Sequence, residues 1–97
     1  MKLRFTPRAA QDIIDIADYI RERNPAAAVR VRDAILATLG LLTRSPHIGR
    51  PQDTEGVRKL VVRKYPYLIY YLVDDEAGEI AILTVRHAAR EREHQDK

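Results

Sequence analysis

The apolar residues of this sequence change their spacing near Gly56, and this change constrains the fold more than any other feature. Between residues 7 and 44 they recur every three or four positions, which is the period of one face of a helix. After Gly56 they occur in three short runs of strand type, "VRKLVV", "YLIYYLVD" and "EIAILTVRH". Helices followed by strands joined through short turns predict an α+β domain with mainly antiparallel pairing.

Two proline-capped helices are predicted in the first half of the chain. Thr6-Pro7 and Asn24-Pro25 each place a capping side chain before a proline, which suits the first helical position because its φ is already helical. The helices should cover residues 7–23 and 25–44 and form an antiparallel hairpin, because few residues join them. The expected core stripes are Ala10, Ile13, Ile14, Ala17 and Ile20 on the first helix, and Val31, Ile35, Leu39 and Leu42 on the second.

A short strand, "KLRF" at residues 2–5, precedes the helices. The complete order is therefore β-α-α-β-β-β, with the helical hairpin on one face of a small, mainly antiparallel sheet. The segment "PHIGRPQDTEG" is predicted to be a loop, and the polar tail from about residue 93 to residue 97 is predicted to fray. We expect a single domain over residues 1–97.

Composition excludes several kinds of chemistry. The chain has no cysteine, and its only serine, Ser45, precedes a proline, which excludes thiolate sites and argues against a serine triad. Its scattered glycines build no phosphate loop, and His47, His87 and His94 lack the spacing of metal ligands, so neither a cofactor nor a metal is expected. No signal peptide and no membrane-spanning run is found, and we therefore expect a cytoplasmic protein.

The charged residues are unevenly distributed. Bases concentrate in "RKLVVRK" and acids in "DDEAGE", which predicts a basic rim and an acidic turn on the sheet. Asp12, Asp15 and Asp18 repeat every three residues on the first helix. We interpret them as part of a solvated face, because a helix spreads these positions apart and bases lie nearby.

The basic residues of the last strands are candidates for a functional surface. Cleavage of RNA by its own 2′-hydroxyl needs a base, an acid and cations, which Arg, Lys and His can supply without a metal. Alternation divides the last strand into two faces. One face should hold Ala81, Leu83, Val85 and His87, and the other Ile80, Ile82, Thr84 and Arg86. Only one of Arg86 and His87 can then face an open site, unless the strand bulges or ends between them. The alternative for these bases is a solvated face of the sheet.

The same alternation divides the aromatic strand "YPYLIYYLV". Tyr67, Ile69 and Tyr71 share one face, and Tyr70 lies on the other with leucines two residues away on each side. We therefore expect Tyr70 in the core, and Tyr67 and Tyr71 in a more exposed platform. Because the helices cover only one face of the sheet, the reverse assignment stays open.

The sequence resembles the ParE branch of the RelE/ParE toxin superfamily, the toxins of type II toxin-antitoxin (plasmid stabilisation) systems. The resemblance covers nearly the whole chain and rests on "RFTPRAAQDIIDIADYI", "PHIGRP", "VRKLVVRKYPYLIYYLVDD" and "EIAILTVRHAARE". It implies the RelE/ParE-like fold and a ParD-like antitoxin as partner in a hetero-oligomer. It also implies DNA gyrase as the target, poisoned by binding, with contact to DNA only indirect, through the antitoxin or gyrase.

Two alternatives remain open. The RelE branch cleaves messenger RNA on the ribosome, and in that case the catalytic residues would be His87, Arg86, Arg63 and Arg58. The tyrosine form of that site is missing, because no aromatic residue follows Tyr71. The long helical hairpin and the "YPYLIYYLV" strand favour the ParE branch. The second alternative is an interaction domain without activity.

The resemblance and the charge pattern together predict two binding surfaces. The residues expected to face the target are Arg86, His87, Arg90, Arg92, Arg63 and Lys64. The residues expected to contact the antitoxin are Tyr67, Tyr71, Arg58, Ile13 and Ile20.

Overall fold

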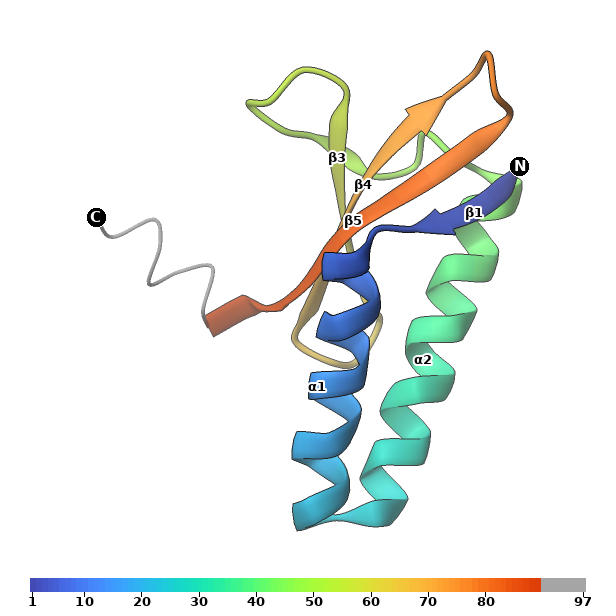
Figure 1. The fold of residues 1–97 in the computed structure, drawn as a ribbon. Coiled ribbons are helices and arrows are strands. Elements are labelled where there is room, and N and C mark those ends of the chain that lie inside the picture. Colours follow the sequence, from blue (N-terminus) through green and yellow to red (C-terminus); the bar gives the residue numbers. More distant parts are fainter. Residues whose placement is uncertain (90–97) are drawn as a thin grey trace.

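The computed structural model describes residues 1–89, which form a helical hairpin packed against a five-stranded sheet (Figure 1). In chain order the elements are β1 (Lys2–Phe5), α1 (Pro7–Arg23), α2 (Pro25–Arg44), β2 (Arg50–Pro51), β3 (Val57–Val61), β4 (Tyr67–Asp74) and β5 (Glu79–His87). The predicted α+β order is confirmed, and a two-residue strand, β2, is added within the segment predicted as a loop. The tail predicted to fray lies outside the described residues.

Both helices begin at the predicted proline caps. The Thr6 hydroxyl accepts a hydrogen bond from the Ala9 N–H at 3.0 Å, and the Asn24 side chain accepts one from the Ala27 N–H at 3.1 Å. Asn24 also ends α1, because its own N–H donates to the Ile20 carbonyl at 2.7 Å. One residue thus closes α1 and opens α2, which fixes the hairpin. Within residues 1–89, no helix is both long and apolar enough to cross a bilayer.

The strands lie in the order β1-β5-β4-β3-β2. Every neighbouring pair is antiparallel except β1 and β5, which are parallel, so the first and last strands of the chain lie side by side (Figure 1). The longest ladder joins β4 to β5, from Tyr67 opposite His87 to Asp74 opposite Glu79. The functional candidates at the end of β5 are therefore held by the best-paired strands of the sheet.

A β-bulge in β5 changes the predicted faces of that strand. Tyr70 pairs with Thr84, but Tyr71 pairs with Ile82, which leaves Leu83 without a partner on β4. Side-chain alternation shifts by one residue at this point. The face toward the helices holds Ile80, Ile82, Val85 and His87. The prediction that grouped Ile80 and Ile82 with Thr84 and Arg86 was wrong, because a strict period of two contains no extra residue.

The core lies between that face of the sheet and the helical hairpin. On α2 the predicted stripe is confirmed; its buried residues include Val31, Ile35, Leu39 and Leu42. On α1 the prediction was partly wrong, because Ala9 is fully buried whereas Ala10 is exposed and Ile14 is 52% exposed. The residues of α1 that pack on the core are Ala9, Ile13, Ile16 and Ile20, at helical spacing. The neighbouring apolar stripe of α1 is left facing outward.

Candidate functional site

Arg86 and His87, the last residues of β5, point to opposite faces of the sheet. The Arg86 guanidinium lies 5.9 Å from the centroid of the Tyr70 ring, on the face away from the helices. The His87 ring lies on the helix face, edge-on to the Tyr67 ring with 5.3 Å between centroids. The bulge precedes both residues, so their side chains still point to opposite faces, although both residues contribute to the lining of one cavity beside α1. The two side chains do not converge.

The hydrogen bonding of His87 defines what its ring can do. The Ala89 N–H donates to Nδ1 of His87 at 3.1 Å. Nδ1 can accept this bond only when unprotonated, so the neutral ring carries its hydrogen on Nε2. A general base needs a free lone pair directed at its substrate, and the lone pair of neutral His87 is already occupied. This geometry argues against the base role and leaves Nε2–H as a donor, either to a binding partner or as a general acid.

Arg58, on β3, clamps the loop that precedes β2. Its guanidinium donates to the carbonyl oxygens of His47 at 3.0 Å and Gly49 at 2.8 Å. The hydroxyl of Tyr71, the cross-strand partner of Arg58, accepts a hydrogen bond from the Gly49 N–H at 2.8 Å. Arg58 therefore lies on the helix face with Tyr71, opposite to Arg86. The predicted ribonuclease residues are divided between the two faces.

Arg63 and Lys64 lie in the turn between β3 and β4, where both are exposed. Because β3 pairs with β4 and β4 with β5, this turn lies at the same end of the sheet as the end of β5. The structure thus brings Arg63, Lys64 and Arg86 to one end of the molecule. Lys64 has a positive φ of 74°, an uncommon conformation for a residue other than glycine. The two other predicted bases, Arg90 and Arg92, lie outside the described residues.

Tyr67 and Tyr71 are buried, so the predicted exposed platform was wrong. Their exposed fractions are 8% and 0%, whereas Tyr70, predicted for the core, is half-buried on the opposite face. The shared face of Tyr67, Ile69 and Tyr71 was predicted correctly, but it is the face that the helices cover. Burial raises the pKa of the Tyr71 phenol, and the hydrogen bond from Gly49 and the charge of Arg58 lower it in part.

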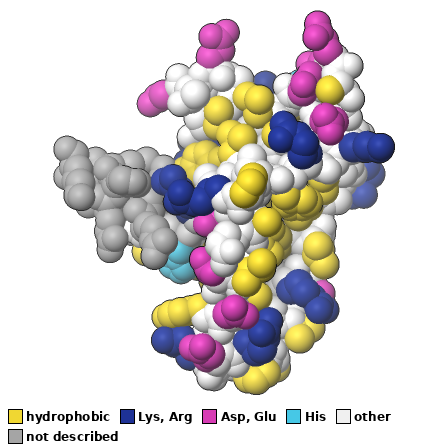
Figure 2. Space-filling model, in the orientation of Figure 1, with side chains coloured by type: hydrophobic (Ala, Val, Ile, Leu, Met, Phe, Trp, Pro, Cys, Tyr) yellow, Lys and Arg dark blue, Asp and Glu magenta, His cyan; other side chains and the backbone are white. Residues whose placement is uncertain are grey.

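An apolar groove of about 380 Å³ lies between α1 and α2, on the side of the hairpin that the sheet leaves uncovered. The predicted Ile13 and Ile20 line it with Phe5, Ile14 and Leu36, and Arg32 is its charged member. Phe5, Ile14 and Leu36 are 40%, 52% and 57% exposed. Figure 2 shows hydrophobic side chains gathered over the hairpin, with charged side chains on its flanks. Side chains of this kind and exposure are typical of a surface that another polypeptide covers.

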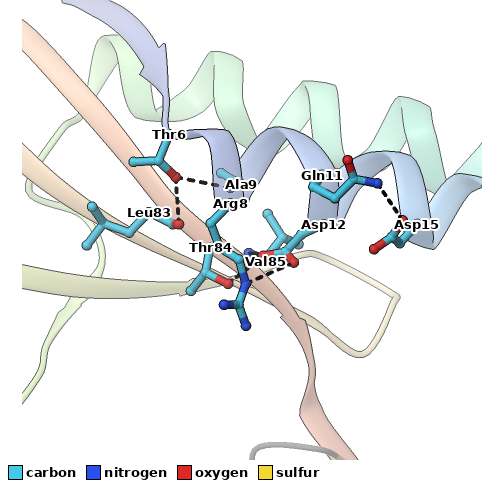
Figure 3. A network of polar contacts seen from close by, with 9 residues as sticks. All are labelled: Thr6, Arg8, Ala9, Gln11, Asp12, Asp15, Leu83, Thr84 and Val85. Atoms are coloured by element: carbon cyan, nitrogen blue, oxygen red, sulfur yellow. Dashed lines mark hydrogen bonds and ion pairs between the residues drawn. The ribbon is translucent and has the colours of Figure 1, made fainter.

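Asp12 joins α1 to β5, a role that the sequence did not reveal (Figure 3). One carboxylate oxygen accepts hydrogen bonds from the Thr84 hydroxyl at 2.5 Å and the Val85 N–H at 3.1 Å. The other oxygen lies 3.4 Å from Nε of Arg8. The prediction of a solvated face was wrong for Asp12, whose side chain is 18% exposed, and right for Asp18, which pairs with an arginine on the helix surface.

The geometry of the sheet explains why an aspartate is needed there. β1 ends at Phe5, opposite Ile82, so the edge of β5 beyond that point has no neighbouring strand. Thr6 continues the edge, because its N–H donates to the Ile82 carbonyl at 3.1 Å and its hydroxyl to the Leu83 carbonyl at 2.8 Å. Asp12 then accepts the next backbone N–H. The start of α1 thus replaces the missing strand and fixes the end of β5. In the sequence, this role is indicated by the position of Asp12, a polar residue beside the apolar stripe formed by Ala9, Ile13 and Ile16.

Comparison with known proteins gives one family. The family profile described as ParE toxin of type II toxin-antitoxin system, parDE, matches residues 3–92 of this chain. Toxin RelE2 of Caulobacter vibrioides is 40% identical over 86 residues, which cover 89% of this chain and 93% of that protein. Protein Y4kP of Sinorhizobium fredii is 36% identical over 87 residues, which cover 90% of this chain and 88% of that protein.

Solved structures show the same fold. A chain of the chromosomal ParDE toxin-antitoxin system from P. aeruginosa superposes with a TM-score of 0.77 at 28% identity, covering 90% of this chain and 95% of that one. A chain of the E. coli RelBE toxin-antitoxin complex superposes with a TM-score of 0.62 at 20% identity, covering 90% and 95%. At 20% identity, the similarity to the RelBE chain shows a shared fold and no more.

Proposed function

This chain belongs to the ParE toxin family of type II toxin-antitoxin systems, and we propose that it poisons DNA gyrase by binding and that a ParD-like antitoxin neutralises it. We choose binding over catalysis because the basic residues are divided between the two faces of the sheet. Arg86 lies with Tyr70 on one face, whereas His87 and Arg58 lie on the other. These basic groups are therefore not gathered on one face of the sheet.

The target-binding surface in this proposal is the basic end of the sheet. Arg63, Lys64 and Arg86 contribute its cations, and His87 contributes a hydrogen-bond donor through Nε2. Arg90 and Arg92 follow directly in the sequence and are proposed as part of the same surface. Cations exposed together favour a negatively charged partner surface. Contact with DNA remains indirect, through gyrase or through the antitoxin.

The antitoxin-binding surface in this proposal is the groove between α1 and α2. An amphipathic, partly acidic segment fits it, because the walls are apolar and Arg32 lies at the groove. Ile13 and Ile20 retain their proposed role as contacts. Tyr71 has no exposed surface and Arg58 is engaged with a loop, so their contribution is to hold the sheet in shape. Tyr67 is buried nearly as completely. Both partners would be met in the cytoplasm.

A ribosome-dependent ribonuclease is the second candidate, because one relative at 40% identity is named toxin RelE2. The two functions are separated by inducing the chain in cells without its antitoxin. The gyrase proposal expects a DNA-damage response and altered plasmid supercoiling while transcripts stay intact. Early cleavage of transcripts with intact DNA would refute it and favour the ribonuclease. No growth defect at all, with the folded chain present, would favour an inactive interaction domain.

A further inference from the structure

A second cavity, of about 600 Å³, lies between α1 and the end of β5. Asp15 and Tyr19 of α1 line it together with Tyr67 and His87 of the sheet, and Ile16 and Val85 complete its apolar part. It is distinct from the groove between the helices, although Ile16 borders both. Its walls therefore combine aromatic rings, a carboxylate and apolar surface.

Two carboxylates of α1, Asp12 and Asp15, line the helix side of this cavity, and Arg86 and His87 line the sheet side. The Asp12 carboxylate is engaged by Arg8, Thr84 and the Val85 N–H. Asp15 is exposed and accepts a hydrogen bond from the neutral amide of Gln11 at 2.8 Å. Within residues 1–89, no cationic group lies within salt-bridge distance of Asp15. Among these described residues, none neutralises the charge of Asp15.

The nearest cation in the lining does not neutralise Asp15. Arg86 contributes to the wall, but its guanidinium lies over the Tyr70 ring on the face of the sheet away from α1. Asp15 is therefore the carboxylate of the lining that a cationic group of a partner can meet.

The aromatic walls select among cations. The guanidinium of Arg23 lies 3.7 Å from the centroid of the Tyr19 ring, so one face of this ring already holds a planar cation of the same chain and the other face would meet a partner's cation. Burial raises the pKa of Tyr67, and the Tyr19 phenol nearby raises it further, which is consistent with two hydroxyl groups facing the same space. A guanidinium can stack on a ring and bind a carboxylate with parallel hydrogen bonds, whereas an ammonium group cannot.

We propose that the cavity formed by Asp15, Tyr19, Tyr67 and His87 receives an arginine side chain from a polypeptide partner. A divalent metal is a poor alternative, because residues 1–89 contain no group of three or more potential ligands. The site lies apart from the groove proposed for the antitoxin. It adjoins the surface proposed for the target, because Arg86 and His87 belong to both.

A peptide titration tests this site. The full chain, labelled with ¹⁵N, is titrated with acetyl-Gly-Arg-Gly-amide and, separately, with the analogue that carries neutral citrulline in place of arginine. We expect shifts in the backbone signals of Tyr19, Tyr67 and His87 with the arginine peptide, and binding weaker by about tenfold or more with citrulline. Asp15→Asn should reduce binding equally, whereas Asp18→Asn should not, because Asp18 pairs with Arg21 outside the cavity.

Three results would overturn the proposal. The first is equal binding of the arginine and citrulline peptides, and the second is unchanged binding in Asp15→Asn. The third is binding that appears only after Arg90→Gln and Arg92→Gln are introduced together. That outcome would mean that an arginine of the same chain, and not of a partner, occupies the site.

Discussion

The carboxylate of Asp12 accepts a hydrogen bond from the hydroxyl of Thr84 at 2.5 Å and so joins the first helix to the last strand. Thr84 lies two residues before Arg86, at the point where β5 has passed the end of β1. The position of the target-facing end of β5 therefore depends on α1 as well as on the neighbouring strand. Contacts that hold α1 to β5 should affect both stability and toxin function.

Replacing Asp12 with alanine should lower the free energy of unfolding by about 2 to 3 kcal/mol. The substitution leaves the Thr84 hydroxyl and the Val85 N–H without their acceptor at a partly buried position. Urea unfolding followed by circular dichroism measures the change. Asp18→Ala is the matched control and should change stability by less than about 0.5 kcal/mol, because its ion pair with Arg21 is exposed. Equal effects of the two substitutions would contradict this role of Asp12.

Two glycine-to-alanine substitutions should have opposite effects on stability. A Cβ at Gly49 would lie 2.6 Å from the Tyr71 hydroxyl and 2.9 Å from the Lys59 carbonyl, so Gly49→Ala should destabilise by about 1 to 3 kcal/mol. A Cβ at Gly40, inside α2, meets no atom within 4 Å. Gly40→Ala should therefore stabilise by about 0.5 to 1 kcal/mol through helix propensity. Thermal unfolding measures the stability of both variants. An unchanged stability of Gly49→Ala would refute the tight contact of this position with Tyr71 and Lys59.

Stability should fall at alkaline pH because of buried tyrosine. Burial raises the pKa of Tyr71 above its ordinary value of 10.0, so the unfolded chain releases this proton first as the pH rises. The contribution of the protonated Tyr71 phenol to stability is complete below about pH 10. It is lost as the pH rises toward the pKa of Tyr71 in the folded protein. Unfolding titrations between pH 8 and 11 should show a smaller decline for Tyr71→Phe. That variant should also be less stable at neutral pH by about 1 kcal/mol, because the Gly49 N–H loses its acceptor. An identical decline in both proteins would exclude this cause.

Lys64→Gly should stabilise the fold by about 0.5 to 1 kcal/mol, because Lys64 has a φ of 74° and glycine adopts this conformation without strain. Lys59→Gly, in the middle of β3, removes the same charge and should instead destabilise by about 1 kcal/mol. Differential scanning calorimetry gives both values. If Lys64 also contacts the target, the Lys64→Gly protein should be more stable and yet less toxic. Loss of stability in both variants would contradict a strained backbone at Lys64.

Leu36→Glu should weaken antitoxin binding by about tenfold or more without unfolding the protein, because Leu36 is 57% exposed in the groove between the helices. Val61→Glu is the matched control, since Val61 is 59% exposed at the end of β3 and lies outside this groove. Isothermal titration calorimetry with the purified antitoxin measures both affinities. Equal loss in the two variants, or none in Leu36→Glu, would place the antitoxin elsewhere.

Local signals in the sequence were sufficient for the fold. Thr6 and Asn24 predicted both helix starts because a cap is a contact between residues close in sequence. Likewise, alternation grouped Tyr67 with Tyr71 correctly. It could not show which face the helices cover, since that depends on the direction in which the hairpin returns to the sheet. The Leu83 bulge was equally hidden, because it follows from pairing with β4 and from no residue type of its own.

The site depended more strongly on long-range contacts and was predicted less well. The proximity of the Arg63-Lys64 turn to Arg86 follows from antiparallel pairing and could be predicted. The role of Asp12 could not, because its partner Thr84 is distant in sequence and the need for an acceptor arises only where β1 ends. The loop clamp formed by Arg58 was missed for the same reason.

The most direct test of the central claim is a supercoiling reaction with purified DNA gyrase, relaxed plasmid and purified toxin. We expect the toxin to inhibit supercoiling and to increase linear, cleaved plasmid, and we expect added antitoxin to reverse both effects. Arg86→Gln should require a higher toxin concentration for the same inhibition, because it removes a cation from the target-facing end. Unchanged supercoiling at every toxin concentration, together with cleavage of messenger RNA on ribosomes by the same preparation, would contradict the account.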